Sequence, residues 1–193
     1  TWRCITTDSE LLALRERWER LFDANPSHSP FLTFGWTLAW LQHLAGEHAL
    51  QILLLEDTSG TLHVVLPLIT TKRPEAGGQT TLTNIGGYGA DCSDHLGCLY
   101  LPKHKLDLIE LVFDGISRFI EPDVRIELNS LDGVNRLSSQ LEAKFKQAGR
   151  YARPSLVHHC PYLELPDSWD ELLKPLSKNF RSQVRRNVNA VMK

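Results

Sequence analysis

Short apolar segments run along the whole chain, and their spacing changes repeatedly between the helical and the extended period. A first helix is predicted from Asp8 or Ser9 to Asn25, and a second from the capping residue Thr33 to Leu44. Two extended runs joined by the turn at 57–60 then predict a hairpin. Because strands and helices alternate beyond it, the order predicts an α/β domain with a mixed sheet.

The same spacing rules place the other elements. Strands are expected over 50–56, 61–70, 80–85, 96–101, 124–128 and 151–165, and helices over 104–120, 135–148 and 176–192. Leu106 is expected in the apolar stripe of the helix 104–120. Asp167 or Ser168 is expected to cap a further short helix.

Composition excludes several protein classes. The chain has 193 residues, of which 42% are hydrophobic and 23% are charged, so a packed core is expected rather than disorder. No apolar run approaches the roughly 18 residues of a membrane span, and the N-terminus does not resemble a signal peptide. The four cysteines, Cys4, Cys92, Cys98 and Cys160, match no zinc spacing, so we expect no metal site and reduced thiols in a cytoplasmic protein.

The charge of the chain is uneven. The segment 174–193 carries six basic and no acidic residues, and subtracting these from the formal net charge of −2 leaves −8 for the remainder. A basic end of this kind attracts phosphate groups, whether of a nucleic acid, a nucleotide-linked substrate or a cofactor. Nucleic-acid binding is disfavoured because the remainder is acidic and Phe180 is the one aromatic residue among the basic ones.

Three segments together resemble the FemAB/CelD-like branch of the GNAT acyltransferases. They are Ser29–Trp40, Gly89–Leu96 and Pro161–Arg186, and the last is the most specific of the three. The likeness extends from Trp18 to the end of the chain. It implies a GNAT-like fold, in which helices flank a mixed, mostly antiparallel sheet. It also implies a cytoplasmic N-acyltransferase, with a possible place in envelope polysaccharide biosynthesis.

In that family two GNAT-like halves pack together. The resemblance therefore implies an N-terminal GNAT-like domain over 1–175, and a basic helix over 176–193 that leads to a second GNAT-like domain missing from this chain. Acyl-CoA, most simply acetyl-CoA, is the expected cofactor. This chain has no glycine-rich loop that runs directly into a helix, the usual cradle for a pyrophosphate. The donor is therefore expected to bind mainly to the missing half, which leaves open whether the chain alone is active.

Asp94 is the candidate catalytic base. It follows a glycine-rich loop at a strand end, and amide formation needs a group that takes a proton from the attacking amine. By resemblance, an aspartate in a similar loop has this role in related peptidyltransferases. The alternative is that Asp91, Ser93 and Asp94 are turn residues that cap backbone amides. Tyr88 is a candidate for binding a sugar or peptide, or else an ordinary half-buried aromatic residue.

Lys178, Arg181 and Arg185 are the candidate substrate-binding cations. At steps of three and four they fall near one face of the predicted basic helix, and arginine binds phosphate in a bidentate manner. The alternative is a solvated basic face. Trp36 and Trp40, one helical turn apart, are expected in the core rather than as a sugar-stacking platform. One short segment carries three side chains of the metal-binding kind, His158, His159 and Cys160, but no further ligands accompany them in the sequence.

These observations favour an N-acyltransferase that acts on an amino sugar, an amino acid or a peptide amine. The donor is either an acyl-CoA or an aminoacyl-tRNA, the one nucleic acid retained as a candidate partner. The alternative hypothesis is a non-catalytic GNAT-like scaffold or protein-interaction domain whose basic helix docks a partner or the other half.

Overall fold

A computed structural model describes residues 1–73, 78–87, 93–131, 137–155 and 163–191. It divides into two compact units, Thr1–Ser155 and Leu156–Lys193, and each is described by itself below. Tyr88, Cys92 and the segment from His158 to Cys160 lie outside the described residues.

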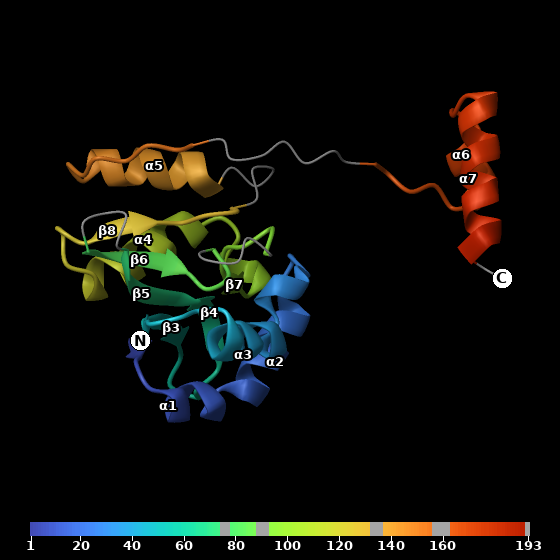
Figure 1. The fold of residues 1–193 in the computed structure, drawn as a ribbon. Helices are drawn as coiled ribbons and strands as arrows, with labels where there is room; N and C mark the ends of the chain where they lie inside the picture. Colours follow the sequence, from blue (N-terminus) through green and yellow to red (C-terminus); the bar gives the residue numbers. More distant parts are fainter. Residues whose placement is uncertain (74–77, 88–92, 132–136, 156–162, 192–193) are drawn as a thin grey trace. The chain divides into compact units, whose positions relative to one another are not determined.

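Unit 1 contains two four-stranded sheets. The first has the order β1 (Trp2–Ile5), β3 (Ile52–Glu56), β4 (Leu62–Leu66) and β7 (Leu99–Tyr100), with every pair antiparallel. The second has the order β2 (Ala49–Leu50), β5 (Leu68–Arg73), β6 (Gln79–Asn84) and β8 (Arg125–Glu127). Its last pair, β6 and β8, is parallel. The expected mixed and mostly antiparallel α/β architecture is thus present in this coarse form (Figure 1).

Two predicted strands each contribute to both sheets. One residue, Gln51, separates β2 from β3, and one residue, Pro67, separates β4 from β5. Pro67 has no N–H to donate to a ladder, and its carbonyl instead accepts from Ile85 N at 2.8 Å. Gln51 N donates to Leu68 O at 3.0 Å beside this corner. The single strands predicted over 50–56 and 61–70 are therefore corrected to two strands each.

Helices cover both faces of the strands. The helices α1 (Asp8–Ala13), α2 (Arg15–Ala24) and α3 (Phe34–His43), with the short η1 (Pro30–Leu32), lie on one side, and α4 (Leu108–Phe119) and α5 (Leu137–Gln147) lie on the other (Figure 1). β3 shows why two cores form. Ile52 and Leu54 join the core beneath α1–α3, whereas Leu53 joins the core beneath α4 and α5.

Capping residues set most of the helix starts. Thr33 caps α3 as predicted, and its hydroxyl accepts from Trp36 N at 3.2 Å. The cap of the first helix is Thr7 rather than Asp8 or Ser9, and that helix is broken at Leu14. The helix expected from His104 begins at Leu108, after the short η3 (Pro102–His104). Leu106 precedes α4 and is 99% exposed, so its placement in the apolar stripe is wrong.

The described part of unit 2 contains α6 (Trp169–Leu173) and α7 (Lys178–Val191). Ser168 caps α6, and the Ser177 hydroxyl accepts from Phe180 N at 3.3 Å at the start of α7. The strand predicted over 151–165 is absent from its described parts, 151–155 and 163–165. Pro154 lies in the first part, where it lacks the N–H that a ladder requires. Among the helices of the described residues, none has the length and the apolar character that a membrane span requires.

Candidate functional site

The parallel strands β6 and β8 end side by side, and one side chain joins their ends. Their pairing closes at Thr83 and Glu127. Beyond it, the Asn84 carboxamide takes the place of a peptide group. Its Nδ2 donates to Asn129 O at 2.8 Å, and its Oδ1 accepts from Asn129 N at 3.0 Å. Ligands of α/β sheets bind outside the carboxyl ends of parallel strands, so this edge is a candidate binding site.

Glycine allows the backbone to pass close to Asn84. A Cβ at Gly87 would lie 2.3 Å from Asn84 Oδ1, so no larger residue fits there. Gly86 has φ of 88°, in the left-handed region that glycine favours. The Asn129 side chain then donates to Gly87 O at 2.8 Å. The glycine-rich loop seen in the sequence thus serves to fasten the ends of two strands.

The next described residues of this loop are tied to the helical layer. Trp36 Nε1 donates to the Ser93 hydroxyl at 3.1 Å, and Ser29 Oγ donates to Asp94 O at 3.4 Å. Leu96 N donates to Ser130 O at 2.9 Å. Trp36 therefore has a polar role in addition to its packing, whereas Trp40 is buried in the core as expected.

Asp94 presents its side chain to solvent from this fixed loop. The side chain is exposed, and none of the described residues forms a hydrogen bond or ion pair with its carboxylate. Ser93, its neighbour, is 2% exposed and faces inward. Chemically, the exposed carboxylate is able to accept a proton from a molecule at the strand ends.

A small cavity lies beneath the same strand ends. Its volume is about 20 Å³, and it is enclosed mainly by apolar side chains of β4, β5, α4 and α5 together with Asn84 and Cys98. A space of this size holds about one water molecule. It is therefore too small for an acyl group.

Two features near these strand ends disfavour a site for acyl-CoA there. The gap between β6 and β8 is already closed by the Asn84 carboxamide. The helix that follows β6, α4, carries Asp107 at its cap and Glu110 in its first turn. Carboxylates at that end disfavour a pyrophosphate, which a helix N-terminus otherwise attracts.

The cations of the basic helix belong to unit 2. Arg181 is partly buried, and its Nη1 donates to Lys174 O at 3.1 Å, where α6 ends. Arg185 Nη2 lies 3.8 Å from Asp170 Oδ1 between two exposed side chains, and Lys178 is exposed. Arg181 thus has a role in joining α6 to α7, and four of its five donors remain for other contacts.

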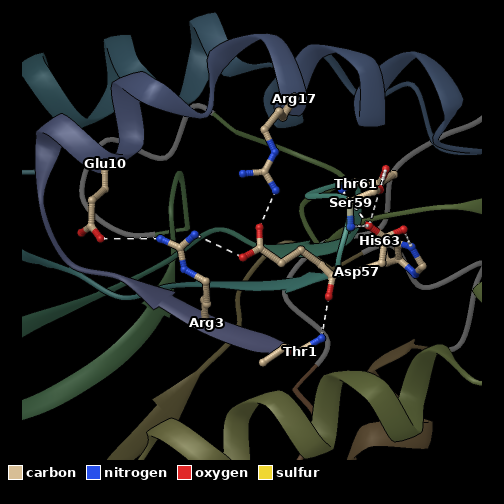
Figure 2. A network of polar contacts seen from close by, with 9 residues as sticks. Thr1, Arg3, Glu10, Arg17, Asp57, Ser59, Thr61 and His63 are labelled. Atoms are coloured by element: carbon tan, nitrogen blue, oxygen red, sulfur yellow. Dashed lines mark hydrogen bonds and ion pairs between the residues drawn. The ribbon is translucent and has the colours of Figure 1, made fainter.

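A larger polar network joins β1, α2 and the β3–β4 hairpin (Figure 2). Glu56 accepts from Arg17 and, at 3.1 Å, from Arg3. Burial raises the pKa of the Glu56 carboxyl, but the hydrogen bonds from Arg17 and Arg3 outweigh burial and lower the pKa overall. A hollow of about 440 Å³ adjoins this network between Arg17, Arg20 and the turn at 59–62. Both arginines are paired, Arg17 with Glu56 and Arg20 with Glu16 at 3.8 Å, so the hollow presents little uncompensated charge.

Sequence reasoning missed a cluster at this hairpin. Two histidines, His63 and His104, lie between two aspartates, Asp57 and Asp107, in one chain of hydrogen bonds. The histidines are 41 residues apart, and only a turn signal at Asp57 marked the region in the sequence. Within the described ranges, no three or more histidines, cysteines and carboxylates are arranged to hold a metal ion. Cys4 and Cys98 are free thiols, in line with the expectation for these two residues.

Comparisons with known proteins leave the family open. No protein-family model matches the chain, and no curated protein matches it in sequence. Among solved structures, it is similar to a mutant of the BH1408 protein from Bacillus halodurans, with 17% sequence identity and a TM-score of 0.40, over 84% of this chain and 99% of that chain. A likeness at this level assigns neither a fold family nor a function.

Proposed function

We propose that unit 1 is the acceptor-side half of an N-acyltransferase that resembles the FemAB/CelD-like branch of the GNAT proteins. The observation that supports this proposal is the position of Asp94. An exposed carboxylate stands on a loop fastened by Trp36 and Ser29, at the joined carboxyl ends of β6 and β8. A general base must be held in place and within reach of its substrate, and the contacts of Ser93 and of the Asp94 backbone with the helical layer support such a role.

The reaction is the transfer of an acyl group to the amine of an amino sugar, an amino acid or a peptide. The amine nitrogen attacks the acyl carbonyl, the new C–N bond forms, and the bond from the acyl carbon to the donor's sulfur or oxygen breaks. Asp94 takes the proton that the amine loses, and the leaving group takes the electron pair of the broken bond. Positioning of the amine beside Asp94 supplies a large part of the rate.

The acyl donor is assigned to a second GNAT-like domain, as the family resemblance implies. The closed strand ends of β6 and β8 and the carboxylates at the start of α4 support this assignment of the donor to the other domain. Bound there, acyl-CoA supplies the activated carbonyl. Lys178, Arg181 and Arg185 are assigned to contacts with an anionic group of substrate or donor, or with that second domain. A role in envelope polysaccharide biosynthesis in the cytoplasm belongs to the same proposal.

The test is acyl transfer by the full-length natural protein, with acetyl-CoA and a panel of amino sugars, amino acids and peptides. Asp94→Asn is expected to lower kcat by about 10²- to 10⁴-fold, the range for loss of a general base. Asp123→Asn, which also neutralises an exposed aspartate, is the matched control and is expected to retain wild-type kcat. Unchanged turnover of Asp94→Asn would remove Asp94 from the mechanism.

The alternative is a non-catalytic GNAT-like scaffold, and one observation favours it. The described strand ends are closed by Asn84 and enclose only about 20 Å³. Thermal shift separates the two proposals. A scaffold shows no stabilisation by any amine of the panel, and its full-length protein shows no transfer. An acceptor half is stabilised by one class of amine, and Asp94→Asn weakens or abolishes that shift.

A further inference from the structure

A chain of three hydrogen-bond contacts links the β3–β4 turn to the beginning of α4. Asp57 Oδ2 lies 3.2 Å from His63 Nε2, His63 Nδ1 lies 3.1 Å from His104 Nε2, and His104 Nδ1 lies 3.2 Å from Asp107 Oδ2. Both imidazoles are 16% exposed, whereas the two carboxylates at the ends are more exposed. We call these four side chains the histidine clasp. Figure 2 shows its hairpin end, with His63 beside Asp57, Ser59 and Thr61.

A β-bulge places His63 in the clasp. Leu55 pairs with Val64 and Glu56 pairs with Leu62, so His63 is the additional residue of β4. A bulge of this kind redirects a side chain out of the regular alternation. His104 comes from η3, and Asp107 is the N-cap residue of α4 without a capping hydrogen bond of its own. The local structure at both ends therefore leaves these side chains available to one another.

The clasp requires three hydrogens on its four ring nitrogens. The nitrogens facing Asp57 and Asp107 must each carry a hydrogen, because ionised carboxylates only accept. The remaining two nitrogens face each other and share a single hydrogen. A neutral imidazole carries one hydrogen and an imidazolium carries two. All three hydrogen bonds are thus made when one histidine of the pair is charged and the other is neutral.

Asp57 is held in the ionised form that this count requires. It accepts from Ser59 Oγ at 2.6 Å, from Thr61 N at 3.0 Å and from Ser59 N at 2.9 Å. The Ser59 hydroxyl, followed by the Thr61 amide and then His63 and the Ser59 amide, lowers the pKa of Asp57 far below its ordinary range. The negative end of the clasp at the hairpin therefore persists throughout the pH range in which histidine titrates.

We propose that the histidine clasp is a binding site for one proton and that it fastens the β3–β4 hairpin to the start of α4 only while that single proton is bound. A fourth hydrogen places two N–H groups against each other between His63 and His104. Removal of the third leaves two lone pairs facing each other, or breaks a contact with an aspartate. The clasp is consequently weakened when the pH falls and also when the pH rises.

The direction in which pH changes the stability follows from proton linkage. An imidazole in an unfolded chain titrates near pH 6.5. Above that value, for as long as the folded pair keeps its third hydrogen, the unfolded pair holds two hydrogens and the folded pair three, so stability falls as pH rises. Below that value, for as long as the folded pair takes up no fourth hydrogen, the unfolded pair holds four and the folded pair three, so stability falls as pH falls. The contribution of the clasp to stability therefore has its maximum near the unfolded value of about pH 6.5 and declines on either side.

Other charged groups around the clasp act outside this window or are paired. Glu56 of β3 is bonded to Arg17 of α2, and Glu110 of α4 is bonded to Lys144 of α5. Lys103 and Lys105 flank His104 and are exposed. Carboxylates with a lowered pKa, including Asp57 and Glu56, lose their contribution only in acid, below about pH 4. Other histidines of the chain and the α-amino group of Thr1, which donates to Glu56 O, belong to classes that also change charge between pH 5 and 9. A double-mutant cycle of His63 and His104 is therefore needed to isolate the two imidazoles.

The proton count is tested first by NMR on the intact chain. Long-range ¹H–¹⁵N spectra of the imidazoles at pH 5 to 9 report which ring nitrogens carry hydrogen. We expect a plateau in which His63 and His104 together carry three, with one shared between His63 Nδ1 and His104 Nε2. Two independent single titrations with no such plateau would overturn the proposal.

The fastening is tested by thermal unfolding of His63→Asn, His104→Asn and the double variant over the same pH range. The double-mutant cycle is expected to give a coupling that is largest in the middle of the range, where the single variants lower Tm by about 4 °C, and that declines on both sides. The exposed His43→Asn is the matched control and should follow the wild-type curve. A coupling that is constant between pH 5 and 9, or absent throughout, would contradict the proposal.

Discussion

At the scale of single residues, unit 1 buries several polar atoms that have no partner. Thr81 Oγ1, Trp40 Nε1 and Arg17 Nε are enclosed and form no hydrogen bond. Each such atom loses its water on folding and gains nothing in return, which costs about 1–3 kcal/mol. The polar groups around the strand ends contrast with these, because Asn84 and Asn129 satisfy one another and Ser93 accepts from Trp36.

Thr81→Val is expected to stabilise the protein. Valine has the shape of threonine without the hydroxyl, and Thr81 lies fully buried in β6 where the hydroxyl has no partner. Its removal should raise the free energy of unfolding by about 1 kcal/mol, seen as a Tm increase of roughly 2–4 °C.

Thr83→Val, two residues along the same strand, is the matched control. Thr83 is equally buried, but its hydroxyl lies 3.5 Å from Asn84 Oδ1 and has a partner to lose. It should be neutral or destabilising. If both valine variants changed Tm equally, the unpaired hydroxyl of Thr81 would not be the cause.

Single-residue predictions from sequence succeeded where local rules apply. The Thr33 cap was identified, and Ser168 was one of two candidates for the cap of α6, because short polar side chains before an apolar run favour helix starts. The cap of the first helix was placed one or two residues too late, since Thr7 rather than Asp8 or Ser9 has this role. The histidine clasp was missed because its members meet through a bulge and a crossover, which leave no local signature. Helical spacing predicted that Trp36 packs against the core, but it did not predict the hydrogen bond from Trp36 Nε1 to the Ser93 hydroxyl.

At the scale of elements, the shared end of β6 and β8 depends on one side chain. Asn84 is 1% exposed and both donates to and accepts from the Asn129 backbone. It therefore continues the parallel pairing for one step beyond the ladder, and it also fixes how closely Gly87 approaches. The position of Gly87, where the glycine-rich loop begins, follows from this contact.

Asn84→Asp tests that dependence. The substitution keeps the shape but replaces the donor with an oxygen that faces the Asn129 carbonyl, and it buries a charge. At pH 7 we expect a loss of about 3 kcal/mol or more in the free energy of unfolding. The loss should shrink as the pH falls, because a protonated carboxyl regains a donor. Denaturant unfolding at pH 7 and pH 4 measures both effects.

The exposed Asn187→Asp on α7 is the control for the added charge. It should change stability by less than about 0.5 kcal/mol at either pH. A pH-independent loss in Asn84→Asp would show that the ionised carboxyl is not its cause, and would contradict the prediction.

The periodicity of apolar residues located most helices and strands but not all of their boundaries. The apolar runs of β3 and β4 were located, but their continuation into a second sheet was not, because Gln51 and Pro67 change the sheet without changing the pattern. The break of the first helix at Leu14 was missed for the same reason, since the apolar spacing continues through it. The parallel pairing of β6 with β8 required the tertiary structure.

At the scale of the whole molecule, the two units differ in how they are held together. Unit 1 has two buried apolar clusters that share the strands β3 and β4. In unit 2, Leu173 is the one buried apolar residue among those described, and most of α7 is exposed. A helix pair with so little buried surface is marginally stable by itself, since most helical stability in proteins comes from packing.

Amide hydrogen exchange of the intact chain should reveal this difference directly. Amides of β3 and β4, buried between two helical layers, are expected to exchange only through global unfolding. Amides of α7 are expected to exchange at least 10²-fold faster, because local opening of unit 2 exposes little apolar surface. If a second GNAT-like domain or an anionic ligand binds the face of Lys178, Arg181 and Arg185, adding that partner should raise the protection of the α7 amides from exchange. Protection of the β3 amides should stay the same. Equal protection of α7 and β3 in the chain alone would show instead that α7 is already packed as firmly as the core.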